Sequence, residues 1–290
     1  MPIKNAFTVD LEEWFHISGV PSLQDMKRWD DFESRIEDNT HRLLKILDDH
    51  DVKATFFVLG WIAEKYPGLV KQVHDAGHEI GNHGYRHRSV HSMSSEEFEE
   101  DLMNSTRVIE GIIDEKITAF RAPSFSVNSS CTWSFEILAE NGYKIDSSIV
   151  KGKRDCGGIQ NTRLAKNHIF DVETKKGNIV EFPLRKERFL GFKVPVTGGG
   201  YLRALPMWLI DHTIKKANKK NVPIFTYIHP SDLDKDRPIL DDLNFTKRFR
   251  AKVGLRTTER KVRYLLSKFD FGTISKVIEE IDVNDSESLQ

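Results

Sequence analysis

Short apolar runs alternate along this chain with longer segments in which apolar residues recur at every third or fourth position. The run ATFFVL, residues 54–59, is continuous and rich in β-branched and aromatic side chains, which is typical of a parallel strand buried on both faces. The segment before it, residues 33–50, carries Leu43 and Leu47 among apolar residues at helical spacing. This alternation predicts strands and helices that follow one another along the chain.

About seven strands are predicted, separated by helical segments. The strands cover residues 6–9, 54–59, 78–81, 117–120, 143–145, 178–183 and 223–228. The helices cover residues 33–50, a segment that stops at Gly77, a segment that begins at Ser94 or Ser95, and residues 133–140 and 206–220. Such alternation favours parallel strands joined by helical crossovers, in either a barrel or an open doubly wound sheet.

Three segments fall outside this alternation. Residues 151–176 are irregular and charged, and predict a loop or small hairpin over one end of the domain. The glycines at 198–200 predict a loop, without the strand and helix that a phosphate-binding glycine loop requires. Residues 236–290 are predicted to form a basic, amphipathic C-terminal extension that packs on residues 1–235 within one domain. Its apolar stripe consists of Leu255, Val262, Leu265, Leu266 and Phe269, and its cations are Lys247, Arg248, Arg250, Lys252, Arg256, Arg260, Lys261 and Arg263.

Composition indicates a soluble globular protein with a sizeable core, at 39% hydrophobic and 30% charged residues. The 43 basic and 44 acidic residues leave a net charge of −1, which gives no bulk attraction for nucleic acid or an anionic membrane. No segment approaches the length of a transmembrane span, and the N-terminus lacks a signal-peptide apolar core. Cys131 and Cys156 have no metal-type spacing and indicate a reducing compartment. We therefore expect a cytoplasmic protein. Such a protein could also act at the inner face of a membrane.

Two histidines four residues apart, His83 and His87, follow the predicted strand at 78–81. If the chain turns into a helix there, the two imidazoles share one face and form a clamp for a divalent metal that lacks only a third ligand. The alternative is a pair of surface or turn histidines, since this segment also contains His78 and His91.

Polar residues stand at the carboxyl ends of five predicted strands. They are Asp10, His83, Arg121, Asp146 and His229. In a β/α barrel these strand ends converge on one face, where active sites lie. Each residue has a structural alternative: Asp146 could cap a turn, Arg121 could pair with a surface acid, and His229 could be a buried histidine bonded to backbone. Their equivalent positions favour one shared site.

The motifs of this chain resemble those of the NodB-type polysaccharide deacetylases. The matching segments are TVDLEEW, NHGYRH, RAPSFS, DSS and IHP, in the order in which that family carries them. A subgroup found in exopolysaccharide and lipopolysaccharide loci also shares GGGY-x-R-x-LP at residues 198–206 and the basic extension at 245–271. The resemblance implies a distorted (β/α)7 barrel and the metal-dependent hydrolysis of an N-acetyl or O-acetyl group on a sugar.

The resemblance also implies a metal site, with His83 and His87 as two ligands. The commonest family form has two adjacent aspartates in the first motif, whereas this chain has Asp10 followed by Glu12 and Glu13. Side chains two apart on a strand face the same side, so Asp10 is assigned as the general base and Glu12 as the third ligand, with Glu13 as the fallback. Zn²⁺ is the expected ion, with Co²⁺, Mn²⁺ or Ni²⁺ as alternatives.

The remaining roles follow from the same resemblance. Arg121 is expected to orient Asp10 and keep it ionised, and Asp146 to hydrogen-bond His229, the general acid for the leaving nitrogen. A sugar-stacking platform is expected from Trp14, Phe125, Tyr201 and Trp208, with ordinary core or rim packing as the alternative. The basic extension could contact nucleotide-sugar phosphates or lipid headgroups, or form a solvated helix face.

The function implied is removal of an acetyl group, most simply an N-acetyl group, from a sugar in cell-surface polysaccharide biosynthesis. The substrate is expected to be nucleotide-linked, lipid-linked or polymeric. One alternative is an amidohydrolase that acts on a small non-sugar amide. Another is a non-catalytic glycan-binding or assembly protein whose metal site has decayed. A glycosidase with two carboxylates ranks last, because it leaves the paired histidines without a role.

Overall fold

A curled, mostly parallel sheet forms the interior of the molecule. The computed structural model describes residues 3–17, 20, 23, 25–152, 157–160, 163–164, 166–189, 192–240, 243 and 245–287. Nine strands pair in the order β10-β1-β2-β3-β4-β5-β7-β6, with β11 also against β1. They are β1 Asn5–Leu11, β2 Thr55–Val58, β3 Glu79–Asn82, β4 Ala119–Phe120, β5 Ile145–Asp146, β6 Phe170–Thr174, β7 Gly177–Glu181, β10 Phe225–Ile228 and β11 Phe271–Gly272. The predicted distorted barrel is confirmed.

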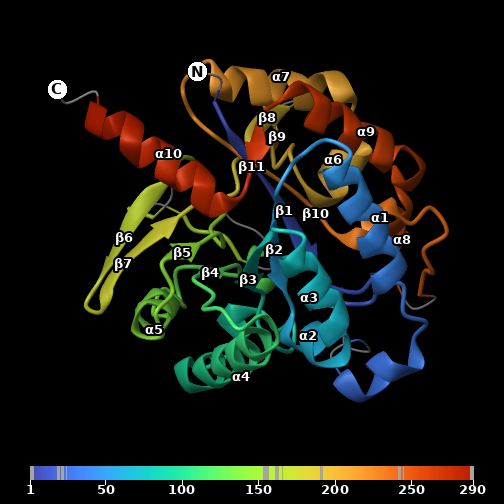
Figure 1. Cartoon of the computed structure of the whole chain (residues 1–290), viewed down its shortest axis with the longest axis horizontal. Helices are drawn as coiled ribbons and strands as arrows, with labels where there is room; N and C mark the ends of the chain where they lie inside the picture. The colour runs from blue at the N-terminus through green and yellow to red at the C-terminus, as the bar shows by residue number, and fades with distance from the viewer. Residues whose placement is uncertain are drawn as a thin grey trace.

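Helices surround this sheet (Figure 1). They are α1 Ile36–Asp48, α2 Gly60–Lys65, α3 Pro67–Asp75, α4 Ser95–Ile113, α5 Ser134–Glu140, α6 Gly199–Ala204, α7 Met207–Asn218, α8 Phe245–Lys252, α9 Leu255–Lys268 and α10 Ile274–Glu287. Short 3-10 turns lie at η2 Met26–Asp31, η3 Val90–Ser92, η4 Pro123–Phe125 and η5 Pro230–Leu233, and a two-stranded ribbon pairs β8 Glu187–Phe189 with β9 Phe192–Val194.

The helix that begins after Ser94 shows how local sequence sets an element. Ser94 and Glu97 form a reciprocal capping box, in which each side chain accepts a hydrogen bond from the other's backbone N–H, at 3.2 and 2.9 Å. Phe98, Leu102 and Ile109 then recur at helical spacing and are all buried. The predicted cap and apolar face of α4 are therefore both present.

The glycines at 198–200 correct one prediction, since Gly199 and Gly200 begin helix α6 rather than form a loop. A Cβ on Gly198 would lie 1.9 Å from the ring of Tyr227 on β10, so only glycine allows the backbone to pass this close to the strand. Gly199 has a φ of +52°, a left-handed conformation that also suits glycine. The triplet brings α6 against the strand that precedes His229.

The hairpin predicted within residues 151–176 lies slightly later in the chain, where β6 and β7 pair antiparallel between Phe170 and Glu181. Cys131 is a buried free thiol, while Cys156 lies outside the described residues. In the part of the chain that the structure describes, no helix is both long and apolar enough to cross a membrane.

The C-terminal extension packs into the barrel. Its predicted stripe on α9 is buried at Leu255, Val262 and Leu265, and α10 buries Ile274 and Val277. Strand β11 pairs with the start of β1, which the sequence did not reveal. The division of the chain at residue 235 stays a prediction.

Candidate active site

The carboxyl ends of β1, β3, β4 and β10 bring the predicted residues to one edge of the sheet. Val9 is paired with Ile228, so His229 follows directly beside Asp10. Asn82 at the end of β3 is paired with Phe120 on β4, which places His83 beside Arg121. Parallel pairing in register therefore converts sequence positions after separate strands into one cluster.

Three potential metal ligands meet at this edge. Oε2 of Glu12 lies 2.6 Å from Nε2 of His87 and 3.8 Å from Nε2 of His83. One ligand atom from each of the three residues lies within 4.8 Å of the other two. Nδ1 of His83 donates to the Arg121 carbonyl at 2.7 Å, which leaves Nε2 with a free lone pair. The donor set fits a divalent ion.

The two histidines do not share a helix, because a loop carries them. Gly84 and His87 have φ values of +74° and +50°, which turn the chain sharply after β3. The loop is held from α4, where the buried Asp101 carboxylate accepts hydrogen bonds from the backbone N–H of Tyr85 at 2.7 Å and of Arg86 at 3.2 Å. The prediction that a helix carries this pair is wrong. The hydrogen bonds from the loop to Asp101 hold the two histidines in place instead of helical hydrogen bonds.

Glu13, the fallback ligand, points away from the cluster. Its Oε1 accepts hydrogen bonds from Ser34 Oγ at 2.5 Å and from the backbone N–H of Arg35 at 3.0 Å and Ile36 at 3.2 Å. It thereby holds the free N–H groups at the start of α1. The alternation of side chains after β1 thus sends Glu12 to the cluster and Glu13 to a helix terminus.

Asp10 forms a buried ion pair with Arg121. Nη1 of Arg121 donates to Oδ1 of Asp10 at 2.7 Å and to Oγ1 of Thr8 at 2.8 Å. Burial favours the neutral carboxyl, but Arg121, together with His83 and His229, holds the pKa of Asp10 below its usual value. Asp10 is therefore an ionised carboxylate with its second oxygen, Oδ2, 4.0 Å from Nε2 of His229.

His229 has a different acid partner from the one predicted. Its Nδ1 lies 3.1 Å from Oδ2 of Asp232, and its backbone N–H donates to the same oxygen at 3.0 Å. Because a carboxylate only accepts, Nδ1 carries the proton and Nε2 faces Asp10 and Glu12. Burial works to lower the pKa of His229, but Asp232, with help from Glu12 and Asp10, raises it to about 9.

The prediction that Asp146 hydrogen-bonds His229 is therefore wrong. Its Oδ1 accepts a hydrogen bond from Ser148 Oγ at 2.5 Å, and it pairs across the sheet with Glu181. Burial raises the pKa of both carboxyl groups, and that of Glu181 is raised further by Asp146. Asp232 was missed, although it follows His229 by three residues in HPSD, the spacing of a side-chain cap on a short helical turn.

Two members of the predicted stacking platform lie in the interior. Trp14 is 6% exposed and donates its indole N–H to the Glu33 carbonyl at 2.9 Å. Phe125 is 3% exposed and packs against the Arg121 guanidinium, 5.1 Å from its ring centre. Trp14 and Phe125 therefore pack in the core, which was the alternative to a role in sugar stacking. Tyr201 and Trp208 are 40% and 64% exposed and stay available to a ligand.

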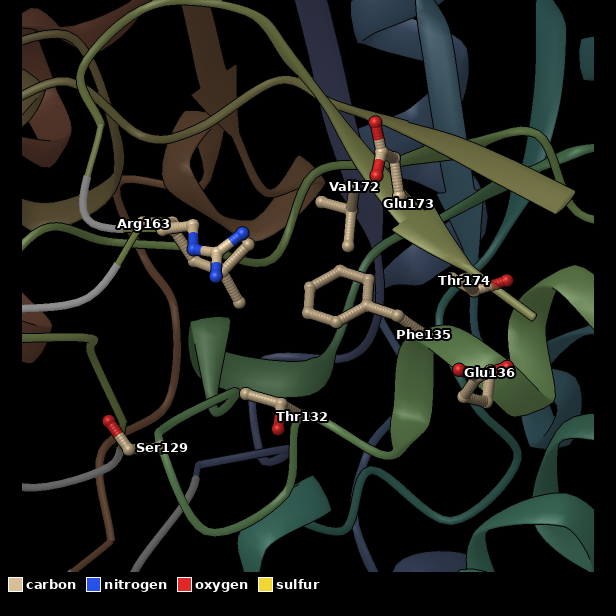
Figure 2. Close-up of a pocket in the computed structure, with 9 residues that line it drawn as sticks. Ser129, Thr132, Phe135, Glu136, Arg163, Val172, Glu173 and Thr174 are labelled. Carbon is tan, nitrogen blue, oxygen red and sulfur yellow. The ribbon is translucent and has the colours of Figure 1, made fainter.

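A cavity of about 440 Å³ lies apart from this cluster, between α5 and the β6–β7 hairpin. Figure 2 shows Phe135 and Val172 at its centre, with Glu136, Arg163 and Glu173 around them. None of the residues that line it belongs to the cluster of acids and histidines, so the chemistry of the site does not extend into this cavity.

A parallel α/β barrel with a carboxylate–arginine pair, an imidazole–carboxylate pair and a Glu-His-His cluster at its carboxyl edge defines a class of hydrolytic enzyme domain. Comparison with family models shows which family each part of the chain resembles. Residues 28–145 match the polysaccharide deacetylase model, and residues 147–279 match a domain of unknown function, DUF3473. Residues 28–145 therefore belong to a NodB-type polysaccharide deacetylase domain, which confirms the family inferred from the motifs.

Individual relatives agree with this family. A peptidoglycan-N-acetylglucosamine deacetylase from Bacillus cereus is 34% identical over 105 residues, which is 36% of this chain and 47% of that protein. The chain spans less than half the length of the curated relatives that it matches. Among solved structures, a Mycobacterium smegmatis protein described as a polysaccharide deacetylase aligns over 98% of this chain and 91% of its own, with a TM-score of 0.68 and 18% identity. The PuuE allantoinase aligns over 95% of this chain and 88% of its own, with a TM-score of 0.60 and 14% identity, and shares the fold.

The site draws on both matched segments and on the residues before them, which carry Asp10 and Glu12. His83, His87 and Arg121 lie in the deacetylase segment, whereas His229 and Asp232 lie in the segment of unknown function. The second segment therefore contributes side chains to the same cluster.

Proposed function

We propose that this protein is a metal-dependent hydrolase that removes an N-acetyl group from a sugar. The observation that carries this proposal is the position of Nε2 of His229, which lies 4.0 Å from Oδ2 of Asp10 and 3.4 Å from Oε1 of Glu12. An acid, a base and a metal-ligand cluster then face one small space. Metal-dependent amide hydrolysis uses these three components.

Glu12, His83 and His87 are the residues that would hold the ion. Two imidazoles and one carboxylate suit Zn²⁺, with Co²⁺, Mn²⁺ and Ni²⁺ as alternatives. When bound, such an ion supplies a Lewis acid and lowers the pKa of water. The buried Oε2 of Glu12 makes no well-formed hydrogen bond despite its short distance to His87, which is consistent with a ligand atom.

The side chains of the chain account for both proton transfers. Asp10, held ionised by Arg121, accepts a proton from the water whose oxygen adds to the acetyl carbonyl carbon. His229 donates the proton on Nε2 to the nitrogen as the C–N bond breaks, which releases acetate and a free amino sugar. Asp232 holds the opposite nitrogen, so the ring presents Nε2 to the reacting group.

The proposed substrate is an acetylated amino sugar used in cell-surface polysaccharide biosynthesis. The names of the relatives support an N-acetylglucosamine-type group, since one acts on peptidoglycan and another is a chitooligosaccharide deacetylase. An exopolysaccharide or lipopolysaccharide context, a nucleotide-linked, lipid-linked or polymeric substrate and a cytoplasmic location belong to the same proposal. Their support is the motif pattern at residues 198–206 and the basic extension.

Acetate release from the purified, Zn²⁺-loaded protein tests the proposal. Chitooligosaccharides, peptidoglycan fragments and UDP-linked N-acetyl sugars are offered, with and without chelator. We expect chelator-sensitive acetate release, and loss of one equivalent of bound metal in His83→Ala. The matched control is His41→Ala, because His41 lies exposed on α1 with Gln72 as its partner.

Two outcomes would overturn the proposal. Hydrolysis of small linear or cyclic amides without acetate release from any sugar would favour an amidohydrolase. Absence of stoichiometric metal in the wild-type protein at saturating Zn²⁺ would favour a non-catalytic glycan-binding protein.

A further inference from the structure

The carboxylate that holds His229 is itself held on its opposite side. Oδ2 of Asp232 faces His229, while Oδ1 lies 2.9 Å from Nε of Arg203 and 3.9 Å from Nη1 of Arg237. Asp232 is 1% exposed, so solvent cannot take the place of either partner. The contact between Nε of Arg203 and Oδ1 of Asp232 is an ion pair without hydrogen-bond alignment. Charge attraction at Oδ1 and the imidazole at Oδ2 together restrict how this buried carboxylate can turn, and so restrict the direction of its hydrogen bond to His229.

Arg203 is in turn held by the C-terminal extension. Its Nη1 donates to the carbonyls of Ala251 at 3.3 Å and Val253 at 3.0 Å, and its Nη2 donates to the Arg250 carbonyl at 2.9 Å. These carbonyls lie at the carboxyl end of α8, where unpaired C=O groups attract a cation. The planar guanidinium thus contacts Asp232 with one nitrogen and the extension with the other two.

Helix α9 fixes the helix that carries Arg203. Nζ of Lys261 donates to the carbonyls of Leu202, Arg203 and Leu205 at 3.0, 2.7 and 2.7 Å, and so caps the end of α6. The α8–α9 corner is tight, because Gly254 has a φ of +74° and a Cβ there would lie 2.2 Å from the Arg203 carbonyl oxygen.

We propose that Arg203 is a positioning residue, and that the C-terminal helices α8 and α9 act through it and Asp232 to orient the imidazole of His229. The role of the proposed general acid rests on the proposed function, but the orientation itself does not. This proposal gives the segment matched as a domain of unknown function a defined task, since His229, Asp232, Arg203 and α8–α9 all lie within residues 147–279. The extension then completes the active site.

A purely structural role for Arg203 makes different predictions, and a double-mutant cycle separates the two. Arg203→Ala, Asp232→Asn and the double variant are compared with the wild type in the Zn²⁺-loaded full chain, with acetate release as the assay. We expect kcat to fall roughly 10- to 100-fold in Arg203→Ala with KM little changed, part of the roughly 10²–10⁴-fold that a positioned general acid contributes. The double variant is expected to be no slower than the slower single variant, because both changes break one chain of contacts.

Arg203→Lys keeps the charge but cannot contact Asp232 and the α8 carbonyls together, so we expect it to restore only part of kcat. Lys276→Ala is the control in the same extension, since Lys276 is exposed on α10, pairs with Glu279 and is expected to leave kcat unchanged. Additive losses in the cycle, or equal kcat in Arg203→Lys and Arg203→Ala together with a lowered Tm, would overturn the positioning role.

A readout independent of activity keeps this proposal separate from the proposed function. In nitrogen-edited NMR of the metal-loaded protein, the Nδ1 proton of His229 is expected to be protected from exchange in the wild type and lost in Arg203→Ala. If the protein releases no acetate from any sugar, the proposed function fails while this measurement still decides the orientation. An Nδ1 proton equally protected in both proteins would overturn the proposal.

Discussion

The two walls of the active site are held by different kinds of contact. On the first wall, Asp10, His83 and Arg121 come from strands of one sheet. His83 donates to the Arg121 carbonyl at the end of the adjacent strand, and Arg121 reaches across the barrel to Asp10 on β1. On the second wall, His229 depends on Asp232, which pairs with Arg203 on α6, and Arg203 in turn bonds to the end of α8. The first wall is thus part of the sheet, whereas the second wall depends on helices that pack against the sheet. We expect damage to the first wall to cost stability, and damage to the second to cost mainly activity.

Arg121→Met should give the largest effect, because it removes the partner of a buried charge. Arg121 is fully buried beneath the site and is the cation bonded to Asp10. Leaving a buried carboxylate unpaired costs roughly 3–5 kcal/mol, so we expect a large loss in the free energy of unfolding as well as loss of activity. Urea denaturation measures the free energy of unfolding of the variant and of the wild type. A variant as stable as the wild type would show that the first wall is not part of the stability core.

Asp232→Asn and Asp146→Asn compare the observed and the originally predicted partner of His229. We expect kcat to fall about 10²-fold or more in Asp232→Asn, because the general acid loses its oriented, protonated state. Asp146→Asn should change kcat much less, since Asp146 bonds Ser148 and Glu181. Steady-state acetate release checks both variants, and the reverse order of effects would restore Asp146 to the role first predicted.

Asp101→Ala tests the support of the metal cluster from outside the site. The change removes both hydrogen bonds that turn the loop between His83 and His87. Outer contacts of this kind contribute about 10- to 100-fold to metal affinity. We expect Zn²⁺ affinity, measured by competition with a chelator, to weaken within that range while the fold persists. Unchanged affinity would mean that the loop is fixed without α4. Glu99→Ala on the same helix is the control, since Glu99 is exposed and accepts a hydrogen bond from Asn141, which lies outside that loop.

Glu181→Gln should give the smallest effect, and one that depends on pH. Burial and the neighbouring Asp146 raise the pKa of Glu181 well above its ordinary 4.5 in the folded state. The folded protein therefore binds this proton more tightly than the unfolded chain, and stability falls as pH rises from about 4.5 through the raised value, by at most about 1.4 kcal/mol per pH unit. We expect Glu181→Gln to gain stability relative to the wild type at pH 8 and to gain little at pH 4. Tm measured across that range checks the sign, and a constant difference would contradict it.

The difference between the walls also explains which residues the sequence could predict. Asp10, Glu12, His83 and Arg121 could be placed because strand alternation and parallel register fix which side chains reach the sheet edge. Asp232 could not be ranked above Asp146, because the choice depends on Arg203, which lies 29 positions earlier in the chain. Contacts between segments far apart in the chain decide which acid bonds to His229, and the sequence around either acid does not reveal those contacts.

Aromatic residues near the motifs show the same limit. Trp14 and Phe125 stand beside site residues in the sequence, yet both are buried, Trp14 against Phe32 and Phe125 against strand β10, whereas Tyr201 on α6 stays exposed. Most strands and helices were predictable from periodicity, but strand β11 and the helix that begins at Gly199 were not. There the triplet of glycines signals close approach to Tyr227, which only the folded barrel reveals.

The pairing of β11 with β1 has a consequence for how the molecule is made. Asn5 and Ala6, at the start of the strand that carries Asp10, bond to residues 271–272 on one side and, through Ala6, to β10 on the other. Strand β2 follows β1 closely and covers one edge of Thr8–Leu11, but the other edge and the first residues of β1 await residues 225–228 and 271–272. The sheet edge that joins Asp10 to His229 is therefore completed late in synthesis, and chains shortened before residue 271 would leave the start of β1 unpaired and open to aggregation.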